Sequence, residues 1–491
     1  MLRHLPALSL AVCFAVPAAA QEGPESFLAE LTALAEEAGG TLTHGDVAEA
    51  GDGIRVSDLV WSFEVEAVPG GSQSFTMRQD AMTILPGEGD VAWVVTVDDA
   101  LSFAAAGTFE AQGEAISSTM EGEVTAPGNR MEVSGEPGAR TFQTSAPEMT
   151  AVFAYAVGPM MEVTADIAMS DVLVTQSFAG DGTNANQDFT IGAMAYEVSA
   201  MADAPFAMTG QLTGLRYIAE GPFRMFDMAA LAEMTEALSY TGTLASSATT
   251  IEAGEPEAAT TVAITTGAGT FSGALGSGAV ETGSEFQSVE IDVAGVTLPV
   301  PMVEVVLSRM GLGYRMPIGV TDTAEEASMR LDLADFTLNK EVWALFDPSG
   351  GLPRDPATLL VDVEGAVQVL VDFMGGAQPQ PGQMPFAAES VTLNTLLLEA
   401  VGARIAASGT AQIDNSAGIP MPIGGVDVEL DGALGLLDQL SAIGLLPPAQ
   451  APAIKGMIAA FAAPGATPDS FTSRVEFLPG GSITANGVPL R

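Results

Sequence analysis

Residues 58–71 read Asp-Leu-Val-Trp-Ser-Phe-Glu-Val-Glu-Ala-Val-Pro-Gly-Gly, and this stretch decides the fold class. The side chains at 59, 61, 63 and 65 are apolar, whereas those at 58, 62, 64 and 66 are acidic or hydroxylated. Successive side chains of a strand point to opposite faces, so this alternation predicts a strand with one buried face and one wet face. The Pro-Gly-Gly that follows predicts a hairpin turn.

The same pattern repeats outward from this stretch. Phe75-Thr76-Met77 begins a return strand, Leu85-Pro86-Gly87 turns the chain again, and apolar residues then alternate from Val91 to Val97. The N-terminal half therefore reads as a meander of antiparallel hairpins. Its further strands are predicted at Thr150–Val157, Asp171–Phe178, Phe189–Val198 and Ala207–Tyr217.

Apolar residues at helical spacing interrupt the strands in four places. A helix near 25–38 begins after Pro24 and ends at Gly39-Gly40, and a second near 223–239 follows Pro222. Two more are predicted near 433–443 and 452–463. In the last of these, the apolar residues at 454, 457, 458 and 461 share one helical face.

The C-terminal half returns to alternation and closes on a predicted hairpin of strands 471–477 and 483–485. Gly267–Gly283 is rich in Gly, Ser and Ala, and it fits either a loop or a closely packed pair of strands. Gly375–Pro385 has the composition of a linker or loop. The other strands of this half are predicted at Thr261–Thr265, Val289–Val293, Leu359–Val363, Arg404–Asp414 and Gly425–Leu430.

These patterns predict an α+β fold dominated by β-structure. Curved antiparallel sheets, built as meanders of hairpins, carry a few apolar helices packed on one face. The length of 491 residues and the order of elements suggest two related β-rich modules, residues 21–242 and 243–491. The sequence shows no clean internal repeat that would relate the two modules.

Residues 1–20 have the parts of a cleavable secretory signal peptide. A basic start precedes the apolar stretch Leu5–Val16, and Ala18-Ala19-Ala20 predicts cleavage after Ala20. The alternative is a lipid anchor at Cys13, but a valine precedes it where a small residue is expected. Soluble export to the periplasm or the medium is therefore favoured. No later segment has the 18 consecutive apolar residues of a transmembrane helix.

The strongly acidic composition bounds the partners. The chain has 62 Asp and Glu against 16 Lys and Arg, a net charge of −46. Such a surface repels phosphate groups, so nucleic-acid binding and electrostatic docking onto membranes are disfavoured. Solubility explains the acidity, and binding of Ca²⁺ or a cationic partner is the alternative. The loop 180–188 resembles a calcium loop but lacks the required order of acids, so a polar hairpin turn is favoured.

Few catalytic groups would remain in the exported chain. Removal of the leader takes away Cys13, the only cysteine, and leaves His44 as the only histidine. His44 lies in a polar turn without a Gly-x-Ser-x-Gly elbow, and no phosphate-binding glycine motif is present. A pair of carboxylates is possible among 62 acids but is not informative. The sequence therefore predicts no enzyme, and it assigns no catalytic, cofactor-binding or metal-ligating residue.

The 23 methionines are the remaining unusual feature of the composition. They fit irregular gaps in the core of a strand-rich protein, or else a soft pocket for a lipid or another apolar ligand. Those singled out by adjacency or by regular spacing are Met160, Met161, Met194, Met201 and Met208.

One segment prompts a family resemblance. Residues 343–359, Trp-Ala-Leu-Phe-Asp-Pro-Ser-Gly-Gly-Leu-Pro-Arg-Asp-Pro-Ala-Thr-Leu, resemble a shared segment of exported alphaproteobacterial proteins in the domain of unknown function 2125 family. The leader, the length, the strand at 54–61 and the closing hairpin are similar too. The family has no assigned activity, so the resemblance implies no functional residue. More distantly, the closing hairpin after apolar helices is similar to periplasmic envelope proteins of the AsmA kind.

Three functions are consistent with these observations. The first is a non-enzymatic periplasmic or envelope protein that binds a lipid or another apolar ligand between sheet and helices. The second is a structural or interaction protein whose acidic surface engages cationic or Ca²⁺-bridged partners. The third, and least favoured, is a hydrolase that uses two carboxylates.

Overall fold

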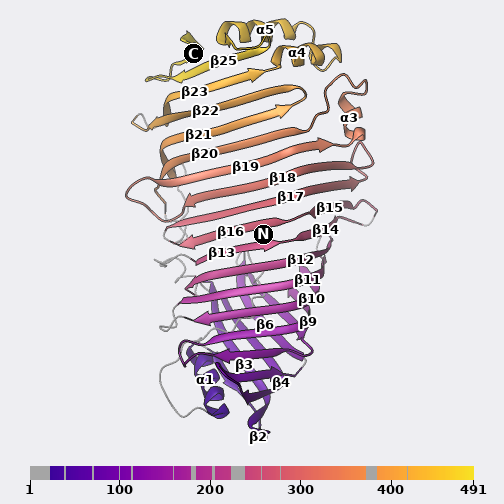
Figure 1. Cartoon of the computed structure of the whole chain (residues 1–491), viewed down its shortest axis with the longest axis vertical. Helices are drawn as coiled ribbons and strands as arrows, with labels where there is room; N and C mark the ends of the chain where they lie inside the picture. The colour runs from indigo at the N-terminus through magenta and orange to yellow at the C-terminus, as the bar shows by residue number, and fades with distance from the viewer. Residues whose placement is uncertain are drawn as a thin grey trace. The chain divides into compact units, whose positions relative to one another are not determined.

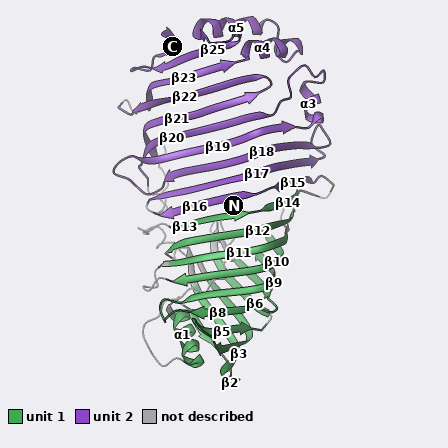
Figure 2. Ribbon diagram, viewed as in Figure 1, with its two compact units in different colours: residues 1–228, 238–257 green, residues 229–237, 258–491 purple. Residues whose placement is uncertain are grey.

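The computed structural model describes residues 23–490 except 38–39, 69–70, 99, 112–113, 159, 179–183, 202–204, 223–237, 256, 277, 372–383 and 417–418. The signal peptide expected at 1–20 lies outside the described residues. The chain divides into two compact units, which Figure 2 shows in different colours: unit 1 comprises residues 1–228 and 238–257, and unit 2 comprises residues 229–237 and 258–491. The expected β-dominated fold of antiparallel hairpins is confirmed in both (Figure 1).

Unit 1 consists of one described helix and a series of strands. They are α1 (Pro24–Glu37), β1 (Gly40–Thr43), β2 (Val47–Ala50), β3 (Gly53–Val68), β4 (Gly71–Pro86), β5 (Val91–Val97), β6 (Ala100–Ala111), β7 (Glu114–Thr125), β8 (Arg130–Ser134), β9 (Thr141–Val157), β10 (Met161–Phe178), β11 (Asn184–Met201), β12 (Phe206–Pro222), β13 (Leu238–Leu244) and β14 (Ser246–Ala253).

The strands of unit 1 form an antiparallel sheet in which long strands pair with two short ones placed end to end. One half of β4 pairs with β6 and the other with β5. Likewise β9 pairs with β7 and β8, and β12 pairs with β13 and β14. Between these, β9, β10, β11 and β12 follow one another directly along the chain. The long hairpins thus give unit 1 a wide, continuous sheet.

Single residues with a left-handed backbone conformation keep the same face of the long strands apolar. In β3 the buried residues are Ile54 and Val56 before Asp58, and Leu59 and Trp61 after it. Asp58 has a φ of 50° and drops out of the pairing with β4. All four apolar residues join one core cluster. The register of pairing with β4 is the same on both sides of Asp58, but the inward positions of β3 change there from even to odd numbers. The same change occurs at Asp171 (φ 52°) in β10.

Helix α1 packs on this apolar face and forms the core of unit 1 with it. Phe27, Leu31 and Leu34 lie at the spacing of one helical face and are almost wholly buried. Phe27 stacks on Trp93, with ring centroids 6.2 Å apart. The helix is also tied to the sheet by a buried ion pair, which joins Glu30 to Arg140. This helix was expected near 25–38.

The described residues of unit 2 also form a single series of strands, with three helices. They are β15 (Thr260–Thr266), β16 (Gly269–Gly276), β17 (Ala279–Gly295), β18 (Val303–Pro317), β19 (Glu325–Leu338), α3 (Lys340–Phe346), β20 (Ala357–Val369), β21 (Phe386–Ala400), β22 (Ala403–Asp414), β23 (Met421–Asp431), α4 (Ala433–Ala442), α5 (Gln450–Phe461), β24 (Ala463–Pro464), β25 (Ser470–Phe477), β26 (Ile483–Ala485) and β27 (Val488–Pro489).

The sheet of unit 2 is a plain meander from β17 to β23, each strand pairing with the next. β15 and β16 pair with the two halves of β17, so the stretch at 267–283 is a strand pair and not a loop. β25 joins β23 after α4 and α5, and β26 completes the expected closing hairpin. Both helices were expected from their apolar spacing.

Some expectations differ from the structure. The modules were expected to meet at residue 242, whereas β13 and β14 both pair with β12 and residues 238–257 belong to unit 1. The helix expected at 223–239 lies outside the described residues apart from its last two, which begin β13. Residues 184–188, expected in a turn, already belong to β11. The linker expected at 375–385 is described only from Met384 onward. Helix α3 was not anticipated.

Candidate functional site

One face of the sheet in unit 2 is apolar and free of charge along in-register rows. The central row crosses six strands from Leu312 in β18 to Val428 in β23, each residue directly opposite the next. Parallel rows run through Tyr314 and Met310 on either side of it. We call these rows the apolar face of unit 2. Its residues are Met310, Leu312, Tyr314, Met329, Leu331, Leu333, Leu359, Val361, Val363, Leu393, Leu396, Leu398, Ile405, Ala407, Gly409, Val426, Val428 and Leu430.

A bulge in β21 is needed to keep this face apolar. Leu393 and Leu396 are three residues apart, yet both lie opposite apolar residues of β20. The extra residue is taken up at Asn394 and Thr395, and Asn394 turns its amide to Asp362 on the other face. Without the bulge, one of the two leucines would point to the polar side.

The apolar face of unit 2 stays accessible to solvent. Tyr314 is 43% exposed, Met329 is 48% exposed and Leu398 is 40% exposed, and no residue of the face is buried. A helix packed across it would bury apolar residues of its own, as α1 does in unit 1. Instead α3 and α4 contain no buried residue, and α5 has only Ala451. Contiguous exposed apolar surface of this kind marks a site of interaction.

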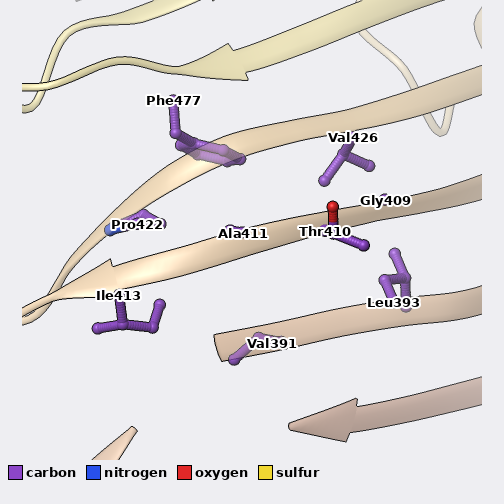
Figure 3. A pocket seen from close by; sticks show the side chains of 9 residues that line it. All are labelled: Val391, Leu393, Gly409, Thr410, Ala411, Ile413, Pro422, Val426 and Phe477. Atoms are coloured by element: carbon purple, nitrogen blue, oxygen red, sulfur yellow. The ribbon is translucent and has the colours of Figure 1, made fainter. Parts of the chain in front are cut away.

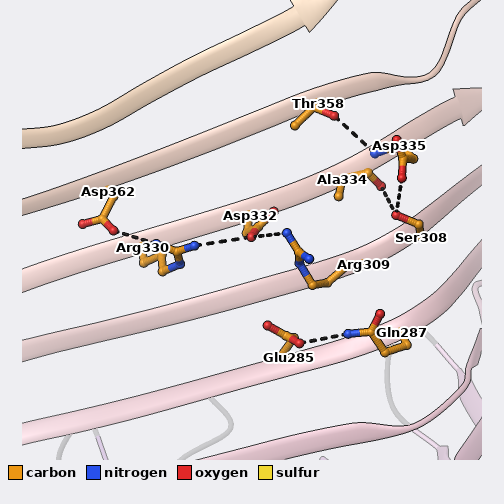
Figure 4. Close-up of polar contacts among 10 residues, drawn as sticks. All are labelled: Glu285, Gln287, Ser308, Arg309, Arg330, Asp332, Ala334, Asp335, Thr358 and Asp362. Atoms are coloured by element: carbon orange, nitrogen blue, oxygen red, sulfur yellow. Dashed lines mark hydrogen bonds and ion pairs between the residues drawn. The ribbon is translucent and has the colours of Figure 1, made fainter. Parts of the chain in front are cut away.

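The opposite face of the same strands is held by ion pairs between neighbours (Figure 4). Arg309 lies 2.8 Å from the carboxylate of Asp332, and Arg330 bridges Asp332 and Asp362 at 3.6 and 2.7 Å. Arg404 and Arg474 pair with acids farther along the sheet. The arginines thus neutralise acids on the polar face, and the sheet is amphipathic.

A shallow hollow of about 250 Å³ lies in the apolar face at one end of β21, β22 and β23 (Figure 3). Gly409 contributes no side chain there, while Val391, Leu393, Val426 and Phe477 form the wall. Thr410 supplies the only side-chain hydroxyl among the residues that line the hollow. The hollow therefore offers a ligand apolar contact with almost no hydrogen bonding.

His44 is exposed, as expected of a solvated turn, and its Nδ1 lies 2.9 Å from the carbonyl oxygen of Gly45. It borders a second, open hollow of about 430 Å³ on the outer side of α1, together with Glu25 and Glu36. These two glutamates are eleven residues apart on one helix, about 16 Å. That separation is too large for paired-carboxylate catalysis, which needs about 5–9.5 Å.

The large side chains noted in the sequence fall into separate places. Trp61 and Trp93 are buried in the core of unit 1, so neither offers an exposed stacking surface. Met160 and Met201 are exposed. Met194 and Met208 lie half-buried on the inner side of β11 and β12. Sequence reasoning missed the rows of unit 2, although the alternation of apolar residues in each strand carried part of the signal.

The segment that prompted the family resemblance has a structural role at its centre. Asp347 ends α3, and its side chain is fully buried. It accepts hydrogen bonds from the backbone N–H groups of Gly351 and Leu352, at 2.8 and 3.0 Å, and from the hydroxyl of Ser349. Arg354 lies over the ring of Trp343, 5.3 Å from its centroid. These contacts fix the loop between α3 and β20.

Replacement of Asp347 by asparagine is expected to lower the midpoint of thermal unfolding at neutral pH. The hydrogen bond from the Leu352 N–H, helped by Gly351, Ser349 and Arg354, holds the pKa of Asp347 below its usual value against the effect of burial. A lowered pKa in the folded state stabilises the protein above the unfolded pKa, about 3.9, and this contribution is lost as the pH falls.

Thermal unfolding of both proteins from pH 7 to pH 2.5 tests this expectation. The gap between the wild type and Asp347→Asn should be widest at pH 5–7. It should begin to narrow near pH 4, where the carboxyl of the unfolded chain takes up a proton, and should close only below the lowered pKa of Asp347 in the folded state. A gap that stays constant with pH would contradict the assigned role of the carboxylate.

Within the described ranges, no group of three or more His, Cys, Asp or Glu side chains is placed to hold a metal ion. In the same part of the chain, no helix has the length and apolar character needed to cross a membrane. The chain matches no protein-family model, and comparison with curated proteins finds no significant relative. The resemblance to the domain of unknown function 2125 family therefore stays a prediction.

Proposed function

We propose that the chain is a non-enzymatic envelope protein that binds the hydrocarbon chain of a lipid on the apolar face of unit 2. The observation that carries this proposal is the set of charge-free, in-register rows that no described helix covers. Six strands spaced about 4.8 Å apart make each row about 24 Å long. One leaflet of hydrocarbon is about 15 Å thick, so a row can accommodate an extended acyl chain.

The chemistry of the face favours hydrocarbon over other occupants. A charged peptide would find no opposite charge on the rows, and a polar ligand would find few donors beside Tyr314 and Thr410. A second copy of the chain is disfavoured because each copy carries a net charge of −46. The same negative charge favours a lipid with a neutral or zwitterionic headgroup. Export to the periplasm, expected from the leader, would bring the protein among envelope lipids.

The substitution Leu396→Lys is expected to weaken lipid binding by about 100-fold. Leu396 lies in the central row, and a lysine within hydrocarbon costs about 3 kcal/mol, with each 1.4 kcal/mol giving a factor of ten. Leu397→Lys is the matched control, because the neighbouring residue points to the polar, acid-rich face. Binding is measured by titrating the full chain, stripped of lipid, with a fluorescent phosphatidylcholine.

Equal affinities for the wild type, Leu396→Lys and Leu397→Lys would refute binding on this face. Light scattering on the same samples tests whether a second copy of the chain occupies the face instead. If the wild type is a dimer without lipid and Leu396→Lys is a monomer, the face is an interface between copies and not a lipid site.

A further inference from the structure

Unit 1 has an apolar sheet face of its own that α1 covers only in part. On β10, β11, β12 and β14 the inward positions are again uncharged and lie in register. One row runs through Ala165, Val198, Met208 and Ile251, each opposite the next. The other positions of this open face are Val163, Ile167, Met169, Met194, Tyr196, Ala200, Phe206, Gly210, Leu212 and Thr249.

The open face is continuous with the surface on which α1 packs. The row through Val198 runs on through Phe153, and through Phe103 and Trp61 beneath α1. Phe103 and Trp61 are buried in the core cluster with α1, and Phe153 packs against that cluster. Val198 and Met208, by contrast, stay partly exposed. The face thus already accepts an apolar body at one end and continues beyond it.

A recurring pair of residues shapes the floor at both ends. Under α1, the ring of Phe103 lies over Gly122 of the neighbouring strand, where an added Cβ would come within 2.4 Å of the ring. On the open part, Tyr196 lies over Gly210 in the same way, also at 2.4 Å. A ring laid across a glycine fills the place of the missing side chain and gives a flat apolar floor.

Tyr196 also brings no unmet polar group to this floor. Its hydroxyl lies 2.6 Å from the hydroxyl of Thr249, so the two hydrogen-bond to each other. The acids of the same strands, such as Asp166 and Glu197, alternate with the inward residues and therefore belong to the outer face. The floor is bordered by aliphatic side chains and methionines, which adapt to a flexible chain.

We infer that this open face of unit 1 is a second lipid site, separate from the apolar face of unit 2, and that it takes one hydrocarbon chain across Tyr196 with its far limit set by α1. The choice of hydrocarbon rests on the same chemistry as the proposed function, namely a floor without charge or free donors on a strongly acidic chain. An apolar occupant is further favoured because the open face continues the surface that already packs against the apolar side of α1.

The test counts fluorescent phosphatidylcholine bound per full-length chain at saturation, by native mass spectrometry and by titration. Val198→Lys places a charge in the middle of the row and is expected to weaken the unit 1 site about 100-fold, so that it no longer fills. Ser199→Lys is the matched control, because its side chain lies on the outer face beside Thr164. The double variant Val198→Lys/Leu396→Lys is expected to bind no lipid.

The two proposals can fail separately. Unchanged stoichiometry in Val198→Lys, with reduced binding in Leu396→Lys, overturns the second site and leaves the first. Reduced stoichiometry in Val198→Lys with full binding in Leu396→Lys removes the site in unit 2 and supports this one. Equal losses in Val198→Lys and Ser199→Lys would show a general effect of added charge and would overturn the inference. Circular dichroism of each variant confirms that the sheet is intact.

Discussion

Replacement of Phe27 by alanine is expected to lower the free energy of unfolding of unit 1 by about 3–5 kcal/mol, the usual cost of removing a buried phenylalanine. Phe27 is fully buried, and its ring stacks on Trp93. The loss includes both the transferred apolar surface and the cavity left above the sheet. No other described helix packs on the core cluster of unit 1, so none of the described helices can fill the space.

The measurement is urea unfolding followed by tryptophan fluorescence in a Trp343→Phe background. Trp61 and Trp93 then report on unit 1 alone. The control is Glu36→Ala in the same helix, an exposed position where the change should stay within about 0.5 kcal/mol. If Phe27→Ala unfolds at the same urea concentration as Glu36→Ala, then α1 does not hold the core as the structure describes.

Much of the strand pattern could be predicted from the sequence, because a half-buried strand shows itself by alternation. The hairpin of β3 and β4 follows from this alternation, and the helices α1, α4 and α5 follow from apolar residues at helical spacing. One usable signal was overlooked. In β3 the apolar positions change from even (Ile54, Val56) to odd (Leu59, Trp61), and this change of phase marks the left-handed residue Asp58 between them. The same change accompanies Asp171 in β10.

The candidate site was harder to predict, because it depends on relations between distant residues. Leu331 and Val361 are thirty residues apart, and only the pairing of β19 with β20 puts them side by side. Whether such a row becomes core or binding surface depends on what covers it. Local sequence gave similar apolar helices for both halves, yet α1 buries a full face while α4 buries none. The alternation of apolar residues predicts that a strand has an apolar face, but only the tertiary packing decides whether that face becomes core or exposed surface.

The functional expectation is sharpened by the same contrast. A ligand was expected between sheet and helices, but in unit 2 the described helices leave the sheet uncovered. The proposed ligand therefore lies on the sheet itself and takes the place that α1 occupies in unit 1. Binding should then stabilise unit 2 by an amount that grows with the logarithm of the free lipid concentration above the Kd, since a ligand that binds only the folded state raises its stability.

The substitution Glu30→Leu is expected to destabilise unit 1 by about 3–5 kcal/mol, because it leaves the charge of Arg140 buried without its partner. The two side chains are only 9% and 7% exposed, and their nearest N···O distance is 3.2 Å. Arg140 also donates to the carbonyl oxygen of Gly135, which holds the guanidinium in place when the carboxylate is gone.

The double variant Glu30→Leu/Arg140→Met should recover most of this loss, since exchange of a buried ion pair for apolar residues is often neutral or stabilising. The comparator is Asp98→Ala, which breaks an exposed pair with Arg55 at 2.8 Å and should cost no more than about 1 kcal/mol. Urea unfolding at 0.1 M and 1 M NaCl separates the two, because salt screens the exposed pair but not the buried one. A loss in Glu30→Leu that disappears at high salt would contradict burial of the pair. A loss that persists in the double variant would show that the unpaired charge of Arg140 is not its cause.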